Sequence, residues 1–148
     1  MPDDGLTVRR ATGRDREALA ALLADAGLPD GHVRAGGGRY YVGRVDGLVT
    51  AGGGLELCGD AALLRSVVVA AAHRGRGHGT AVCGTLEAAA RDAGVREVFL
   101  LTTTATAFFD GLGYDVVDRD AAPASVRETA QFGDVCPTTA TCMRREIE

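Results

Sequence analysis

One short segment combines residue types that could hold an anionic ligand: Arg74–Gly79, with the sequence Arg-Gly-Arg-Gly-His-Gly, between an apolar run and a predicted helix. Its glycines carry no side chains, so a ligand can approach the backbone closely. The first N–H groups of a helix lack partners within the helix, and the helix dipole favours negative charge there. Arg74 and Arg76 could add charge-assisted hydrogen bonds to phosphate oxygens. The segment therefore predicts a cradle for a pyrophosphate group.

Two other phosphate-binding motifs fit this segment less well. A dinucleotide fingerprint, G-x-G-x-x-G, needs glycine at the position of Thr80 and an early strand–helix–strand unit, which the sequence lacks. A Walker loop needs a lysine, but the 16 basic residues of the chain are all arginines. A flexible turn without function is the remaining alternative, and the position between a strand and a helix argues against it.

The spacing of apolar and turn residues predicts the elements that would hold this loop. Strands are expected at residues 6–10, 39–45, 48–58, 61–69, 95–101, 114–119 and 138–147. Helices are expected from Thr12 or Asp15 to Ala26, from 77 to 93 and from 105 to 112, and residues 123–132 read as a short helix or a loop. This order predicts one mixed α/β domain over residues 1–148.

Local features refine these elements. Asp46-Gly47 predicts a two-residue hairpin, and Gly52-Gly53-Gly54 predicts a bulge or bend inside a strand. Two helices carry apolar stripes at helical spacing, which should be their buried faces. The stripes are Leu19, Leu22, Leu23 and Ala26 in the first helix, and Val82, Leu86, Ala89, Ala90 and Ala93 in the second.

Composition narrows the functional classes. The net charge is −4 and no long basic run occurs, which argues against nucleic-acid binding. No apolar run reaches the roughly 18 residues that cross a membrane, and the acidic start Met1–Gly5 does not resemble a signal peptide. We therefore expect a cytoplasmic protein. The four cysteines include no CxxC pair, so no metal site is predicted.

The loop and a later segment together resemble a known family. Arg74-x-x-Gly77-x-Gly79 after an apolar strand matches the R/Q-x-x-G-x-G/A signature of the GNAT acyltransferases, and the stretch from Phe108 to Tyr114 resembles their F-Y-x-x-x-G-F/Y element. The resemblance covers nearly the whole chain. It implies a central, mostly antiparallel mixed sheet flanked by helices, with acetyl-CoA as co-substrate. The pantetheine arm would lie between strands that end near Val69 and Leu101 and splay apart.

The resemblance assigns the coenzyme to the end of the apolar strand, the Gly-rich loop and the later aromatic pair. The expected coenzyme-binding residues are Val67, Val68, Val69, Arg74, Gly75, Arg76, Gly77, His78, Gly79, Thr80, Phe108 and Phe109.

Acetyl transfer to an amine sets the remaining requirements. An alkylamine, with a pKa near about 10, arrives protonated, so a base must help. Glu56 is the candidate base, because the family often places a carboxylate there, and its apolar neighbours could raise its pKa by burial. A solvated glutamate on an outer face is the equally weighted alternative. In the resemblance, a backbone N–H near Val68 or Val69 polarises the thioester oxygen.

The general acid is less defined. The family often has a tyrosine where this chain has Phe109, which cannot donate a proton. Tyr114 is an alternative, although packing at the start of a strand is the simpler expectation for it. Thr102 is the second catalytic candidate, because it could position water or substrate, as could Thr103 and Ser66; ordinary strand-end polarity is the alternative for each. Water can suffice, since a thiolate is a fair leaving group.

A narrower resemblance exists to the arsenic-resistance-associated branch of the family. It rests on Leu64-Arg65-Ser66-Val67, Leu100–Thr104, Phe108-Phe109, and Cys136-Pro137 followed by Cys142-Met143. It implies a small-molecule amine acceptor and allows an organoarsenical. Cys136 and Cys142 could then touch trivalent arsenic, although plain core cysteines are the simpler expectation.

The histidines and thiols have simpler expected roles. His78 should face solvent or phosphate, and His73 should sit at a strand end. His32, in the early loop, could line the acceptor site. A covalent acetyl-cysteine route has little support, because no Cys–His pair is adjacent in the sequence. Cys83 should be buried in its helix.

Two rivals to a small-molecule N-acetyltransferase remain open. One is a coenzyme A-binding sensor or interaction module with the same fold and little turnover. The other is a protein-lysine acetyltransferase, for which an acidic surface is weak support. The acceptor would contact residues 27–38 and 120–136, which are predicted loops. The last strands of such folds often pair across subunits, so a homodimer is compatible with the sequence.

Overall fold

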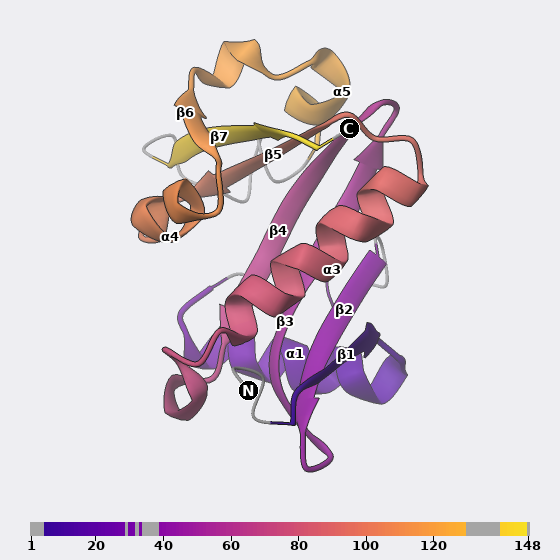
Figure 1. The fold of residues 1–148 in the computed structure, drawn as a ribbon, viewed down its shortest axis with the longest axis vertical. Helices are drawn as coiled ribbons and strands as arrows, with labels where there is room; N and C mark the ends of the chain where they lie inside the picture. Colours follow the sequence, from indigo (N-terminus) through magenta and orange to yellow (C-terminus); the bar gives the residue numbers. More distant parts are fainter. Residues whose placement is uncertain (1–4, 29, 32, 34–38, 130–139, 148) are drawn as a thin grey trace. The chain divides into compact units, whose positions relative to one another are not determined.

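Seven strands form one mixed sheet in the order β1-β2-β3-β4-β5-β7-β6 (Figure 1). The computed structural model describes residues 5–28, 30, 31, 33, 39–129 and 140–147. The strands are β1 Thr7–Arg10, β2 Arg39–Val45, β3 Leu48–Cys58, β4 Ala61–Val69, β5 Glu97–Thr102, β6 Asp115–Val117 and β7 Thr141–Glu146. The helices are α1 Gly13–Asp25, η1 Ala71–His73, α3 His78–Asp92, α4 Thr106–Gly111, η2 Arg119–Ala121 and α5 Ala124–Arg127. The predicted mixed α/β class and element order are confirmed.

The chain divides into two compact units that share β3, β4 and α3. The first comprises Met1–Leu55 and Ser66–Ala88, and the second comprises Glu56–Arg65 and Ala89–Glu148. Each unit has its own apolar cluster. The first cluster joins α1 to β2 and the end of β4, and the second joins the start of β4 to β5, β7 and α5.

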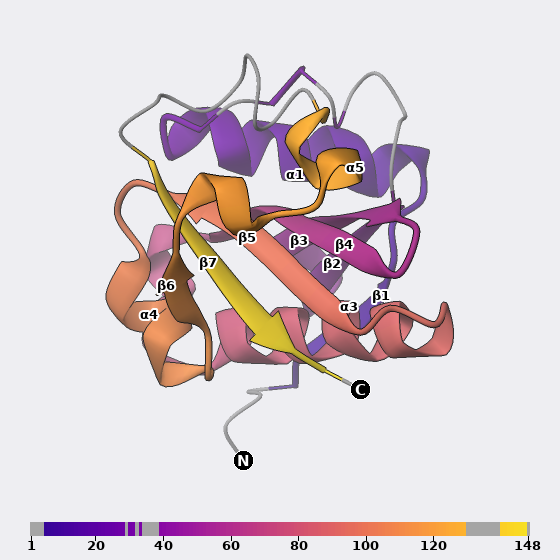
Figure 2. The same cartoon turned by 90° about the horizontal axis from the view of Figure 1, so that it is seen from above.

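In the first unit, α1 and α3 cover opposite faces of the sheet (Figure 2). The glycines of β3 permit this close approach. An ideal Cβ at Gly52 would lie 2.6 Å from Leu19 Cδ1 of α1, and one at Gly53 would lie 2.9 Å from Leu86 Cδ1 of α3. Successive strand residues point to opposite faces, so the two glycines make room for the two helices.

The predicted bulge lies elsewhere in β3. Tyr40 to Val42 pair in unbroken antiparallel register with Gly54 to Gly52, so the glycine run is regular. The register shifts between Gly43 and Arg44, whose partners are Ala51 and Val49, which leaves Thr50 as the extra residue. The glycines therefore make room for the packing of the two helices, and the bulge expected at these three positions lies at Thr50 instead.

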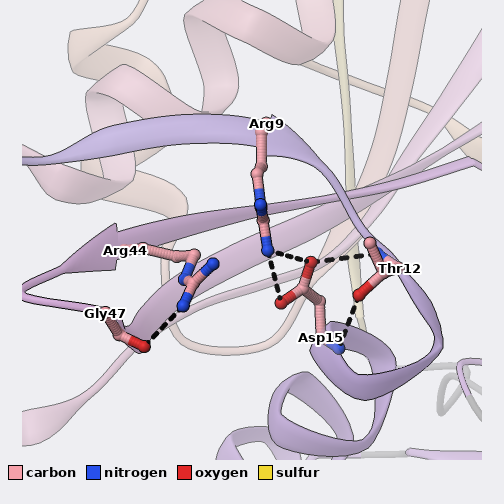
Figure 3. A network of polar contacts seen from close by, with 5 residues as sticks. All are labelled: Arg9, Thr12, Asp15, Arg44 and Gly47. Carbon is pink, nitrogen blue, oxygen red and sulfur yellow. Dashed lines mark hydrogen bonds and ion pairs between the residues drawn. The ribbon is translucent and has the colours of Figure 1, made fainter.

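Helix α1 begins with a reciprocal cap that also holds β1 (Figure 3). Thr12 is the N-cap: its Oγ1 accepts the Asp15 N–H at 3.4 Å, and Asp15 Oδ2 accepts the Thr12 N–H at 2.9 Å. Arg9 of β1 adds an ion pair to the buried Asp15 carboxylate at 3.1 Å. Burial by itself would raise the pKa of Asp15, but the hydrogen bonds from Thr12 and Arg9 lower it below its ordinary value.

Both predicted tight turns form. Asp46 and Gly47 have φ angles of 51° and 80°, as a type I′ hairpin requires, and Arg44 Nη2 donates to the Gly47 carbonyl at 2.7 Å (Figure 3). Gly59 has a φ of 71° at the first position of the turn between β3 and β4. Because turn chemistry is local, the bounds of β2, β3 and β4 agree with the prediction.

In the second unit, β4 and β5 pair in parallel over Ala61–Leu63 and Glu97–Phe99. Beyond Leu63 and Phe99 no further pair joins the described residues of these two strands, although both strands continue. β5 also pairs with β7, and β7 with β6, both antiparallel. Val126 of α5 packs on the cluster of these strands. The mostly antiparallel pattern around one parallel pair agrees with the predicted sheet.

Other expectations need correction. Ala26 and Ala93 were placed on buried faces but are exposed, because each lies just after the last residue of its helix; Ala20 is buried although it was not expected to be. The expected burial of Cys83 is confirmed. β6 has three residues, since η2 replaces the end of the strand predicted over 114–119.

Among the described helices, none is both long and apolar enough to cross a membrane. His32, Cys136 and parts of both predicted acceptor loops, residues 34–38 and 130–136 among them, lie outside the described residues.

Candidate coenzyme site and catalytic residues

The predicted phosphate loop lies between η1 and the start of α3, within the first unit. Gly75 and Gly77 have φ angles of 80° and 83°, the left-handed region that glycine adopts without strain. The stretch from Arg74 to Gly77 is exposed. The Gly77 carbonyl accepts the Ala81 N–H at 3.0 Å, so the helix begins there and the three N–H groups after Gly77 have no acceptor within it. These features fit a pyrophosphate.

The two loop arginines are placed differently. Arg74 Nε donates to the carbonyl of Val69, the last residue of β4, at 3.2 Å. A guanidinium has five N–H donors, so this bond leaves four for other acceptors. Arg76 is exposed at the tip of the loop. Arg74 therefore ties the loop to the end of β4, a role that its type and position in the sequence did not predict.

His78 is the clearest departure from expectation in the loop. It was expected to face solvent or phosphate, but it is only 1 % exposed. Neither of its ring nitrogens has a hydrogen-bond partner among the described residues, and the same is true of His73 Nδ1. The two rings stack with centroids 5.6 Å apart and planes at 24°. Its imidazole is therefore a packed group, because helix α3 begins at His78 and turns the side chain inward.

The end of β4 exposes backbone groups on one edge. Ala70 N–H donates to the Thr50 carbonyl of β3 at 2.7 Å. Backbone polar groups of successive strand residues point to opposite sides, so the N–H and C=O of Val69 point away from β3. The Val68 side chain is buried in the cluster with α1, while Val67 and Val69 are half-buried. Of the two expected donors, this alternation favours Val69.

Ser66 interrupts β4 with a φ of 59°. A residue with a Cβ costs about 1–2 kcal/mol in this region. Such strained backbone is concentrated at functional sites. Ser66 was considered in the sequence only for its hydroxyl group, and the strain of its backbone has no signal in the residue type.

Glu56 is ion-paired in the second unit. Its Oε1 lies 2.9 Å from Nη1 of Arg65, whose side chain is 6 % exposed against 32 % for Glu56. The carboxylate is thus partly buried, which lies between the buried base and the solvated outer-face glutamate that the sequence left open. Leu55 is buried but Leu57 is partly exposed, so the apolar surroundings lie on one side only.

The partner of Glu56 was missed from the sequence. A signal was present, because Arg65 is the single charged residue in β4. The two-residue turn at Gly59-Asp60 places Cys58 opposite Ala61, which makes Glu56 and Arg65 diagonal neighbours on one face. Burial of an arginine usually requires such a partner.

The residues after β5 separate into exposed and packed groups. Thr102 Oγ1 accepts the Ala105 N–H at 3.0 Å, so the hydroxyl helps to close the turn before α4. Phe108 is 38 % exposed, whereas Phe109 is buried edge-on against Tyr114, with centroids 5.6 Å apart. Tyr114 is fully buried, which agrees with the packing role. Of the aromatic pair, Phe108 has the surface that a ligand could contact.

The described thiols are poor nucleophiles. Burial raises the pKa of Cys83 to about 12 and that of Cys142 to about 11, and it also raises the pKa of Cys58. All three are free cysteines with little exposure. Because the thiolate is the reactive form, these residues are not suited to carry an acetyl group.

A family comparison identifies the fold and its chemistry. Residues 9–114, which include the phosphate loop, match the model described as acetyltransferase (GNAT) family. The chain belongs to this acetyltransferase (GNAT) family. It is therefore an N-acetyltransferase that uses acetyl-CoA as its co-substrate. No curated protein sequence matches the chain.

Solved structures share the fold of this chain. Rv2747 from Mycobacterium tuberculosis, in complex with CoA and NLQ, is 24 % identical with a TM-score of 0.80, over 96 % of this chain and 99 % of that one. N-acetylglutamate synthase from Neisseria gonorrhoeae, complexed with coenzyme A and L-arginine, is 18 % identical with a TM-score of 0.79; the match covers 97 % of this chain and 33 % of that one. A GNAT-family acetyltransferase from Staphylococcus aureus is 13 % identical with a TM-score of 0.80, over 97 % and 99 %. At these identities the likeness supports the fold.

Proposed function

We propose that this N-acetyltransferase transfers the acetyl group of acetyl-CoA to a small-molecule amine by direct attack of the amine on the thioester. The observation that carries the proposal is the exposed loop from Arg74 to Gly77, followed by the first N–H groups of α3, which have no acceptor within the helix. A helix N-terminus with arginines beside it binds a pyrophosphate. The predicted coenzyme-binding residues other than His78 and Phe109 keep that assignment.

In this proposal Glu56 accepts the proton that the amine loses. The amine lone pair forms the new C–N bond, the C–S bond breaks, and the departing thiolate takes a proton from water. Val69 N–H, on the edge of β4 away from β3, donates to the thioester oxygen as negative charge develops on it. Arg65 holds the Glu56 carboxylate in one orientation through the 2.9 Å ion pair. Thr102 is retained as a residue that positions water or substrate.

The test of Glu56 measures release of the free thiol of coenzyme A with a panel of small amines. Glu56→Gln should lower kcat by roughly 10²–10⁴-fold, the usual contribution of a general base, with little change in coenzyme affinity. Glu17→Gln is the matched control, because Glu17 is an exposed glutamate of α1 outside the predicted acceptor loops. An unchanged rate in Glu56→Gln would remove Glu56 from the mechanism.

The same assay separates the proposal from a coenzyme-binding module without turnover. The hypothesis of a coenzyme-binding module is supported by Phe109, which is buried at the position where the family often has a tyrosine that acts as the general acid. Tight coenzyme binding with no thiol release for any amine or lysine-containing peptide would support the module. Release with peptides alone would favour a protein-lysine acetyltransferase.

For the acceptor we propose an organoarsenical amino acid, on the narrower sequence resemblance. Two residues of that resemblance have unusual surroundings or geometry in β4. Arg65 is buried and ion-paired, and Ser66 has a strained backbone. The proposal predicts a higher kcat/KM for the arsenical than for the same amino acid without arsenic. Equal values would reject arsenic recognition and leave the amine acetyltransferase intact. The cytoplasmic location and the homodimer remain predictions from the sequence.

A further inference from the structure

The phosphate loop has an aromatic contact across its two ends. His73 is the last residue of η1 and His78 is the first residue of α3, so four residues lie between them. Their rings stack with centroids 5.6 Å apart and planes at 24°, within the range of favourable offset pairs. The contact closes the loop at its base.

The stack adds to the bond between Arg74 Nε and the Val69 carbonyl, which ties the loop to the end of β4. Arg74 to Gly77 are exposed, and an ideal Cβ at Gly75 would meet no atom within 4 Å. Two glycines at positive φ give the backbone wide freedom when it is not held. Ordering such a loop costs conformational entropy, which a ligand must offset unless the loop is ordered beforehand.

Three of the ring nitrogens in this contact are also buried. His78 is 1 % exposed, and both of its ring nitrogens and His73 Nδ1 are buried without hydrogen-bond partners in the described part of the chain. Buried polar atoms without partners cost free energy. A ligand also cannot reach these atoms, so a direct contact between the His78 nitrogens and the coenzyme does not explain the ring.

We propose that His73 and His78 are positioning residues for the coenzyme. Their stack holds the loop in the conformation that presents the N–H groups after Gly77 to the pyrophosphate. The rings act through the backbone of the loop and do not touch the ligand. This inference rests on the proposed placement of the pyrophosphate at residues 74–79.

The proposal predicts which property of the ring matters. His78→Leu puts an apolar side chain in place of the ring and so removes the stack. It should weaken acetyl-CoA binding about two- to twelvefold, the equivalent of about 0.5–1.5 kcal/mol for an aromatic pair. His78→Phe keeps the stack and removes the unpaired nitrogens. It should therefore bind acetyl-CoA more tightly than His78→Leu, and it should unfold at a higher temperature than the native protein. The loss should appear in the KM for acetyl-CoA, with kcat little changed.

The test is calorimetric titration with acetyl-CoA of His73→Leu, His78→Leu, their double variant and His78→Phe, each first shown to be folded by circular dichroism. If the stack is responsible, the two Leu substitutions should not add, because either one removes the same contact. Additive losses, or equal affinity of the Leu and Phe variants at position 78, would overturn the proposal. If Arg74→Ala with Gly77→Ala leaves binding unchanged, the placement of the pyrophosphate fails instead.

Discussion

Gly52 of β3 should be intolerant of even one added methyl group. An ideal Cβ there would lie 2.6 Å from Leu19 Cδ1 and 2.9 Å from the Tyr41 carbonyl oxygen. The leucine is a flexible side chain that can move, but the carbonyl belongs to the backbone of β2 and moves only with the strand. Overpacking of this kind costs about 1–3 kcal/mol, and the smaller entropy of the unfolded alanine chain returns about 0.4–1 kcal/mol. Gly52→Ala should therefore destabilise the protein by about 1–2 kcal/mol.

Gly84 provides a control within the same protein. It is exposed in the middle of α3, and an ideal Cβ there would meet nothing within 4 Å. Gly84→Ala should stabilise the protein by about 0.5–1 kcal/mol, because alanine is the better helix former. The same substitution should thus have opposite signs at the two positions.

Thermal unfolding followed by circular dichroism measures both effects. At about 2–4 °C per kcal/mol for a chain of this size, Gly52→Ala should lower Tm by about 2–8 °C and Gly84→Ala should raise it by about 1–4 °C. Urea unfolding gives the free energies directly if the m-values agree. A Gly52→Ala protein as stable as the native one would refute the close approach of α1 to β3.

Two further predictions concern charge and thiols. Asp15→Asn should lower the free energy of unfolding by about 0.5–1 kcal/mol at neutral pH. The loss should be smaller in acid, because the pKa of Asp15 in the folded protein is lowered from its unfolded value of 3.8. The stabilisation by the carboxylate is therefore complete above the unfolded pKa and is lost as the pH falls through the folded pKa. Urea unfolding at pH 7 and pH 3 checks this, and an equal cost at both would contradict it. Cys83 and Cys142, with pKa values raised to about 12 and about 11, should react with iodoacetamide at pH 8 far more slowly in the folded protein than in urea. Mass spectrometry of the labelled peptides reports this, and rapid labelling of the folded chain would show that these residues are more accessible than the structure indicates.

Features that depend on local chemistry were predictable. The bounds of β2, β3 and β4 follow from Asp46-Gly47 and Gly59-Asp60, because a tight turn needs particular residues whatever surrounds it. The start of α3 follows from the Gly-rich loop for the same reason. The N-cap of α1 was left between Thr12 and Asp15, and both take part, as the two halves of one capping box.

Features that depend on packing between distant segments were not predictable. The glycine run of β3 was taken as a bulge or bend, since nothing local shows that Leu19 and Leu86 press on it from two helices. The burial of His78 likewise depends on its stack with His73. In the candidate site, by contrast, the buried partner of Glu56 was missed although it could have been found: Arg65 is the single charge of its strand, and the predicted two-residue turn sets the register that makes the two residues neighbours.

Calorimetric titration with acetyl-CoA tests the central claim most directly. The intact protein is compared with Arg74→Ala, Gly77→Ala, and with a matched control, Arg96→Ala, Gly84→Ala, which changes an exposed arginine and an exposed glycine outside the loop. The intact protein and the control should bind acetyl-CoA in the micromolar range, and the loop variant should not bind it. Absence of binding by the intact protein at moderate and high salt, or equal binding by all three, would contradict the assignment of residues 74–79 as the coenzyme site.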